Sequence, residues 1–102
     1  DDAGDVGWSP SVAVDPAGGL HISYKDVDNG HLKYAYYVGD GGNCGPGGTT
    51  WHCETVDSGE GVGASSSLAM DSAGHPHITY YGPQPAGATD FRHAFYDGNQ
   101  WV

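Results

Sequence analysis

The strongest constraint on how this chain can fold is an internal repeat. Residues 6–24, VGWSPSVAVDPAGGLHISY, align with residues 62–80, VGASSSLAMDSAGHPHITY, at an offset of 56, and 11 of the 19 positions are identical. Self-similarity at a period near fifty residues is typical of stacked copies of one supersecondary unit. We therefore divide the chain into a first repeat, 1–56, and a second repeat, 57–102. A unit of this size buries little surface by itself, so we expect further copies to complete the fold.

Each repeat contains short segments, rich in β-branched and aromatic residues, that alternate with a period of two. The expected strands are Ser11–Asp15, Leu20–Lys25, His31–Val38 and Trp51–Val56 in the first repeat, and Ser67–Asp71, Pro76–Tyr81, Asp90–Tyr96 and a stub at Trp101–Val102 in the second. No stretch longer than a turn has helical periodicity. The sequence therefore predicts an all-β fold of two four-stranded antiparallel units. The first unit has a loop insertion at 38–50, and the second has a truncated fourth strand.

An aspartate occupies the same hairpin position in both repeats, with Asp15 before Pro-Ala-Gly-Gly and Asp71 before Ser-Ala-Gly-His. A carboxylate at this position caps the amides of a tight turn, and the glycine that follows supplies a positive φ. The other use of paired carboxylates, acid–base catalysis, requires two acids that converge in contrasting environments. The spacing gives no sign of convergence, so we expect turn-capping at both positions and no enzymatic activity.

The combined pattern S-[VL]-A-[VM]-D-x-A-G-x-x-H-I-[ST]-Y, L-K-Y-A-Y-Y and W-x-x-E-T-V-D covers nearly the whole chain. It resembles the blades of bacterial secreted and surface β-propeller proteins, which are loosely similar to sialidase-type and Asp-box propellers. The resemblance implies that each repeat is one four-stranded blade, and a closed ring needs about four to eight blades. Sialidase chemistry does not follow from it. His21-Ile22 and His77-Ile78 stand where the Asp-box motif has Thr-Trp, and Arg92 is the only arginine in the chain.

Cys44 and Cys53 are the only cysteines, and they flank a Gly-rich stretch that begins inside the insertion. We expect a disulfide between them, because closing a loop of roughly ten residues contributes about 2.5 kcal/mol to stability. Free thiols and metal ligation are the alternatives, although two cysteines alone do not complete a zinc site. A disulfide would indicate an oxidising compartment, and hence a secreted or cell-surface protein.

Six histidines raise the question of a metal site, above all in His75-Pro76-His77. Residues two apart on a strand share a face, so these two imidazoles could converge on a metal ion. However, His77 corresponds to His21, which has no second histidine two residues before it. We therefore favour a structural role, in which the repeated histidine bonds to backbone or to the adjacent blade. We expect neither a metal nor a cofactor.

Aromatic side chains gather on the third expected strand of each repeat and at the start of the fourth. The candidates for stacking on a ligand are Tyr34, Tyr36, Tyr37, Trp51, Tyr96 and Trp101. These residues resemble the aromatic inventory of sugar-binding propellers, in which flat rings stack on pyranose faces. The alternative is that the rings fill the wedge between radially packed blades, where bulky side chains are needed toward the rim. We favour the packing role.

Thirteen acidic residues against three basic residues give the chain a net charge of −10. Nucleic-acid binding needs clustered Lys and Arg, so this balance argues against a nucleic-acid partner. No apolar run approaches the roughly 20 residues of a membrane-spanning helix.

Together these features favour a non-enzymatic, extracellular structural module whose partners are copies of itself. An unpaired strand edge is a template for another chain. Identical units that join head to tail form a ring where the rotation closes and a fibre where it does not. The alternative function is that of a lectin-like propeller, which would bind carbohydrate or another ligand through its aromatic side chains.

Overall fold

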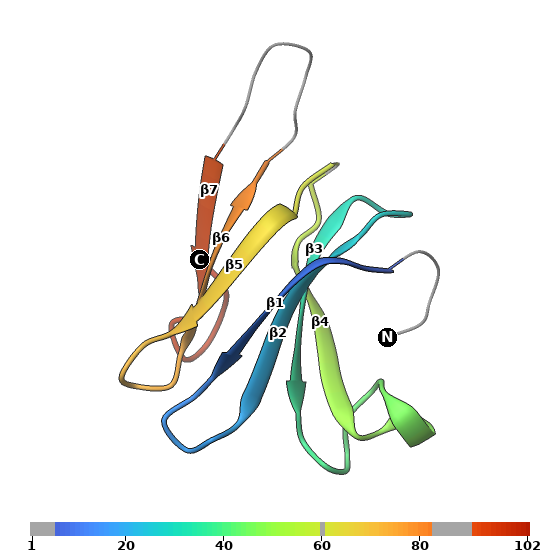
Figure 1. Cartoon of the computed structure of the whole chain (residues 1–102), viewed down its shortest axis with the longest axis vertical. Coiled ribbons are helices and arrows are strands. Elements are labelled where there is room, and N and C mark those ends of the chain that lie inside the picture. Colours follow the sequence, from blue (N-terminus) through green and yellow to red (C-terminus); the bar gives the residue numbers. More distant parts are fainter. Residues whose placement is uncertain (1–5, 60, 83–90) are drawn as a thin grey trace.

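The computed structural model describes residues 6–59, 61–82 and 91–102, which form two antiparallel β-sheets (Figure 1). The first sheet has the order β1-β2-β3-β4, with strands β1 (Val6–Val14), β2 (Leu20–Asp26), β3 (His31–Tyr37) and β4 (Trp51–Asp57). The second has the order β5-β6-β7, with strands β5 (Ala64–Met70), β6 (Pro76–Tyr81) and β7 (Phe91–Phe95). The predicted all-β, antiparallel architecture is confirmed.

The observed strands differ from the expected ones mainly at their starts. β1 extends back to Val6, because Val6 and Trp8 continue the pairing with β2 across two irregularities in register. β5 likewise begins at Ala64, ahead of an irregularity in its pairing with β6. The expected strand Asp90–Tyr96 begins at a residue outside the described part of the chain. The expected stub at Trp101–Val102 is represented by an isolated bridge between Trp101 and Tyr96.

Both sheets have the same register. The equivalent rows of paired residues are Val12–Ile22–Ala35 in the first sheet and Leu68–Ile78–Ala94 in the second. Side chains alternate between the two faces of a strand, so each sheet has one face built on this row. We call it the aliphatic face, with Val12, Ile22, Tyr24 and Ala35 in the first sheet and Leu68, Ile78, Tyr80 and Ala94 in the second. The opposite face, here the histidine face, carries His21, Ser23, Leu32, Tyr34 and Tyr36 in the first sheet and His77, Thr79, Phe91, His93 and Phe95 in the second.

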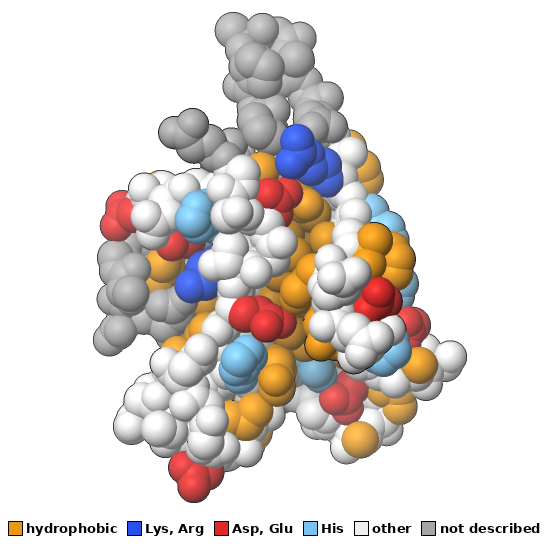
Figure 2. All heavy atoms as spheres, turned by 180° about the vertical axis from the view of Figure 1, so that it is seen from behind, with side chains coloured by type: hydrophobic (Ala, Val, Ile, Leu, Met, Phe, Trp, Pro, Cys, Tyr) orange, Lys and Arg blue, Asp and Glu red, His pale blue; other side chains and the backbone are white. Residues whose placement is uncertain are grey.

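The two sheets pack with unlike faces together. The histidine face of the first sheet lies on the aliphatic face of the second, and their contact, the seam, holds the main core. Its buried members are Leu32, Tyr34, Val62, Leu68, Ile78, Tyr80 and Ala94. Seen from behind, hydrophobic side chains follow this seam (Figure 2). Burial of apolar surface at the seam therefore holds the two repeats together.

The seam combines hydrogen bonds near the first strand of each sheet with aromatic packing farther out. β1 and β5 lie against each other (Figure 1), and there the contacts are made by small hydroxyl side chains. The Ser23 and Ser66 hydroxyls are 2.8 Å apart, and the backbone N–H of Leu68 donates to the Ser11 hydroxyl over 3.0 Å. Toward β3 and β4 the space is filled by large rings, with Tyr34 and Trp101 at a centroid distance of 5.2 Å.

None of the described residues forms a helix of the length and apolarity needed to cross a membrane.

Candidate functional site

Each β-hairpin that opens a repeat is organised by its aspartate. Asp15 Oδ1 accepts hydrogen bonds from the N–H groups of Ala17 and Gly19, at 2.9 and 2.7 Å. Its other oxygen accepts from His21 Nε2 at 2.8 Å. The hydrogen bond from His21 is the largest of the influences that lower the pKa of Asp15 below its ordinary value, followed by that from Gly19.

The second repeat has the same arrangement. Asp71 Oδ1 accepts from the N–H groups of Ala73 and His75, both at 2.9 Å, and Oδ2 accepts from His77 Nε2 at 3.0 Å. The backbone hydrogen bond from His75 is the first cause of the lowered pKa of Asp71, and the bond from His77 is the second. The two aspartates lie at the expected turns, but their histidine partners were not predicted from the sequence. The signal was present, because Asp and His recur with the same spacing of six residues in both repeats.

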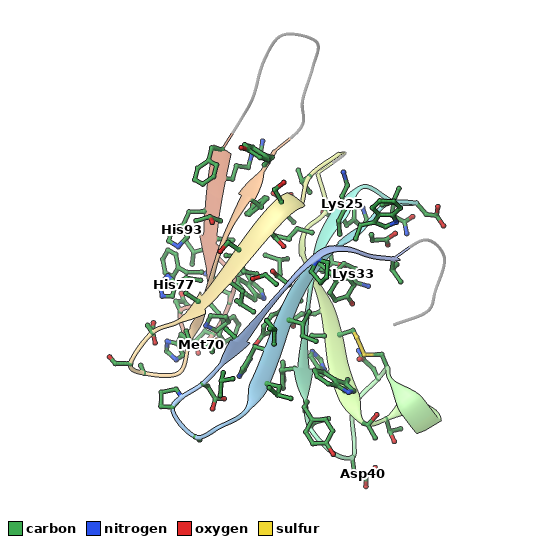
Figure 3. The ribbon with its side chains drawn as sticks, viewed as in Figure 1. Lys25, Lys33, Asp40, Met70, His77 and His93 are labelled. Atoms are coloured by element: carbon green, nitrogen blue, oxygen red, sulfur yellow. A yellow bond between two sulfur atoms is a disulfide. The ribbon has the colours of Figure 1, made fainter. Side chains whose placement is uncertain are left out.

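The histidines of the two repeats then diverge in their surroundings. His21 is buried in the seam, where its Nδ1 contacts the Tyr34 hydroxyl. His93 replaces Tyr34 in the second repeat, and its Nε2 lies 3.1 Å from Nδ1 of His77. This pair stacks with ring centroids 5.3 Å apart and points away from the first sheet (Figure 3). The hydrogen-bonding partners of His21 and His77 are therefore side chains, and not the backbone or adjacent blade that we expected.

A pocket of about 220 Å³ opens in the seam between the two sheets. We call it the seam pocket, and its lining residues are His21, Tyr34, Tyr36, Glu54, Gly74, His75, Pro76 and Tyr96. The first sheet contributes β2, β3 and β4, and the second contributes the β5–β6 turn, the start of β6 and the residue after β7. The pocket therefore exists only because the two repeats pack against each other.

Glu54 is the acidic group of the seam pocket, and two neighbours hold its carboxylate in place. Trp101 Nε1 donates to Oε1 at 3.0 Å, and His52 Nε2 lies 3.3 Å from Oε2. Burial raises the pKa of both Tyr34 and Tyr36 above the ordinary value, and the negative charge of Glu54 raises it further. The two phenols consequently stay protonated at neutral pH and present hydroxyl groups beside a fixed carboxylate.

The structure brings together four of the six aromatic residues proposed for ligand stacking. Tyr34, Tyr36 and Tyr96 line the seam pocket, and Trp101 lies between Tyr34 and Tyr96. The other two, Tyr37 and Trp51, lie on the aliphatic side of the first sheet, where they make an edge-on contact at 5.5 Å. Strand alternation explains the split, because Tyr34 and Tyr36 share a face that Tyr37 does not. Glu54 was not predicted as a site residue, because its hydrogen-bond partner Trp101 lies 47 positions away in the sequence.

A second hollow, the aliphatic groove, lies on the open aliphatic face of the first sheet. It measures about 240 Å³ and is lined by Gly7, Pro10, Ile22, Tyr24, Ala35, Gly45, Trp51 and Cys53. The Cys44–Cys53 disulfide is formed, with a Cα–Cα distance of 6.1 Å, and it holds the insertion beside this groove. No charged side chain is among the lining residues of this groove, so its chemistry is that of an apolar contact surface.

A metal site has no support in the described residues, which contain no group of three or more His, Cys, Asp or Glu side chains suited to hold an ion. His75 and His77 do not share one environment. His75 lines the seam pocket and contacts the Tyr96 ring, whereas His77 stacks on His93.

Comparisons with protein-family models, with curated proteins and with solved structures find no match for this chain.

Proposed function

We propose that this chain is a non-enzymatic structural module whose two sheets act as neighbouring blades of a propeller-like stack. In this proposal the module associates with copies of itself, head to tail, to form a ring or a fibre outside the cell. The resemblance of the repeats to secreted and surface propeller blades belongs to the same proposal.

One observation carries the proposal, namely that the seam joins unlike faces. The first sheet uses its histidine face and the second its aliphatic face. Each sheet therefore has one face that no second sheet covers, and these two faces carry the same residue positions as the two faces already in contact. A heterologous contact of this kind can repeat from copy to copy.

The exposure of Val12 and Phe91 supports this interpretation, whereas Tyr24 and Ala35 on the same aliphatic face as Val12 are as buried as their counterparts Tyr80 and Ala94. Leu68 and Ile78 in the seam are 7% and 0% exposed, whereas the first-sheet counterpart of Leu68, Val12, is 64% exposed. On the other open face Phe91 is 65% exposed. Both residues stand at positions that are buried in the seam of the other repeat, Leu68 and Leu32, so their exposure points to an interaction surface.

The disulfide supports an extracellular location, because such bonds persist in oxidising compartments. A non-enzymatic role is supported by the carboxylates. Asp15 and Asp71 are each engaged by turn amides and a histidine at separate hairpins, and Glu54 is held by Trp101 and His52.

Sedimentation velocity over a range of chain concentrations tests the proposal. We expect species larger than one chain, with a mass that rises with concentration. A folded chain that sediments as a monomer at every concentration would overturn it.

A second candidate function is carbohydrate binding in the seam pocket, favoured by the gathering of Tyr34, Tyr36 and Tyr96 around a fixed carboxylate. The pocket is smaller than the roughly 300 Å³ at which drug-sized sites begin, so it suits a single sugar ring. A glycan array tests this candidate. A hit that Tyr36→Phe weakens and Tyr37→Phe, on the opposite face, leaves unchanged would support it, whereas a silent array would count against it.

A further inference from the structure

We infer that Phe91 of one copy fills the aliphatic groove of a second copy of this chain, in the position that Leu32 occupies inside the seam. The inference rests on the proposed self-association and names its central contact. It follows from four observations on equivalent positions of the two repeats.

The first observation is what fills the equivalent of the groove inside the molecule. Ile22, Tyr24 and Ala35 line the groove, and their counterparts Ile78, Tyr80 and Ala94 are buried in one cluster with Leu32 and Tyr34 of the first sheet. In the seam, the β3 side chains of one repeat thus occupy the aliphatic face of the next.

The second observation concerns a glycine pair at the edge of the two surfaces. Gly63 touches β3 so closely that a Cβ there would stand 3.1 Å from the Cα of Leu32. Its counterpart Gly7 lines the groove, and a Cβ there would meet nothing within 4 Å. Both glycines have a positive φ, 91° at Gly7 and 98° at Gly63. The backbone therefore takes the same shape in both repeats, but in only one of them does an apolar residue rest on it.

The third observation is that Phe91 stands at the Leu32 position of the second repeat. Leu32 is fully buried, whereas Phe91 points from β7 with 65% of its surface exposed and has an edge-on contact with Tyr81 at 5.9 Å. An exposed phenylalanine of this kind is typical of the residues that anchor protein interfaces.

The fourth observation extends the match to the next residue on the same face. Tyr34 packs edge-on against Trp101 at 5.2 Å. The counterpart of Tyr34 is His93, on the open histidine face, and the counterpart of Trp101 is Trp51, in the groove. With Phe91 seated in the groove, His93 falls beside Trp51 of the second copy. The groove and its occupant are both free of charge, which suits a fully desolvated contact.

The test uses one variant on each face and a control away from both. Phe91→Asp removes the inserted side chain, and Val12→Asp places a charge on the open aliphatic face at an exposed position of β1. Val27→Asp, at an exposed residue outside both faces, introduces the same charge as a control. Circular dichroism establishes that each variant folds, and sedimentation velocity reports association.

We expect Phe91→Asp and Val12→Asp each to weaken association about thirty-fold, the effect of removing a central interface residue. Val27→Asp leaves association unchanged, and Phe91→Leu, which installs the residue of the seam, keeps it within about threefold. At a concentration at which each variant alone is monomeric, a mixture of Phe91→Asp and Val12→Asp forms dimers and nothing larger, because one intact aliphatic face meets one intact Phe91.

The failures are distinguishable. If the unaltered chain associates and Phe91→Asp associates equally well, the Phe91 contact is wrong and the proposed self-association stands. If the mixture stays monomeric while the unaltered chain assembles, the head-to-tail pairing of these two faces is wrong. If the unaltered chain is always monomeric, the proposed function and this inference both fall.

Discussion

At the scale of single residues, Asp57 joins the two repeats at the end of β4. Its Oδ1 accepts from the N–H of Gly59 at 2.8 Å, and its Oδ2 accepts from the Tyr80 hydroxyl at 2.8 Å and from Arg92 at 3.2 Å. Burial alone opposes ionisation of Asp57, but the hydrogen bonds from Gly59, Tyr80 and Arg92 outweigh it, so the pKa of Asp57 is lowered. Burial, with the bond to Asp57 second, raises the pKa of Tyr80 to about 12. Tyr80 therefore remains a donor over the whole neutral range.

A pH dependence follows from Asp57. Because its pKa is lower in the folded chain than the ordinary 3.8, ionised Asp57 stabilises the fold above that value. The stabilisation is lost as the pH falls through the lowered pKa. We expect Asp57→Asn to reduce the free energy of unfolding at neutral pH by about 1–2 kcal/mol.

Urea unfolding at neutral pH and near pH 3 measures this effect. The difference between Asp57→Asn and the unaltered chain should shrink in acid, and Asp40→Asn, on the exposed loop after β3, serves as the control (Figure 3). A difference that is as large in acid as at neutral pH would mean that the charge of Asp57 does not stabilise the seam.

At the scale of strands, the two repeats provide matched pairs of residues in different surroundings. Ile22 and Ile78 occupy the same place in β2 and β6, and each pairs with an alanine on the following strand. Ile78 is 0% exposed in the seam, whereas Ile22 lines the open groove. The chemistry and local pairing are constant. The surroundings differ, because a second sheet covers Ile78, whereas Ile22 shares its groove with Gly45 and Cys53 beside the disulfide.

Replacing each isoleucine by alanine should reveal the difference in surroundings as a difference in the loss of unfolding free energy. Ile78→Ala leaves a cavity in the main core and should cost about 3 kcal/mol of unfolding free energy. Ile22→Ala, measured on dilute monomeric chain by chemical denaturation, should cost less than half of that. Equal costs would indicate that the groove is already closed in the single chain.

The strands and the alternation of their faces could be predicted from the sequence, because the residue types in each segment alternate with a period of two. The turn aspartates and the Cys44–Cys53 disulfide could also be predicted, since both depend on residues that are close together in the sequence. Which face of one sheet packs against which face of the other could not be predicted. Both faces of each sheet carry apolar side chains, so the alternation of side chains does not distinguish them. Contacts such as Trp101 with Glu54 depend on how one sheet sits on the other, and no local pattern encodes that.

At the scale of the whole molecule, the net charge of −10 opposes the association proposed above. Copies of one chain carry like charge and repel each other, and salt screens that repulsion over a Debye length of about 10 Å at 0.1 M. The proposed contact surface is apolar at its centre, so screening should remove the repulsion without weakening the contact.

Association should therefore tighten several-fold when the salt concentration is raised from about 0.01 M, where charges act over about 30 Å, to about 1 M, where they act over about 3 Å. Sedimentation equilibrium in sodium chloride measures the change. Weaker association at high salt would indicate that ion pairs, rather than the open apolar faces, hold the copies together.

The joining of unlike faces at the seam has a consequence for anything built from this chain. In the proposed head-to-tail assembly, every added copy covers one free surface and presents another of the same kind, so the two ends of a linear array differ chemically. Such an array is directional, with an aliphatic surface at one tip and a histidine-rich surface at the other. A capping protein that binds only one of the two ends would stop growth at that end and leave the other end free to grow.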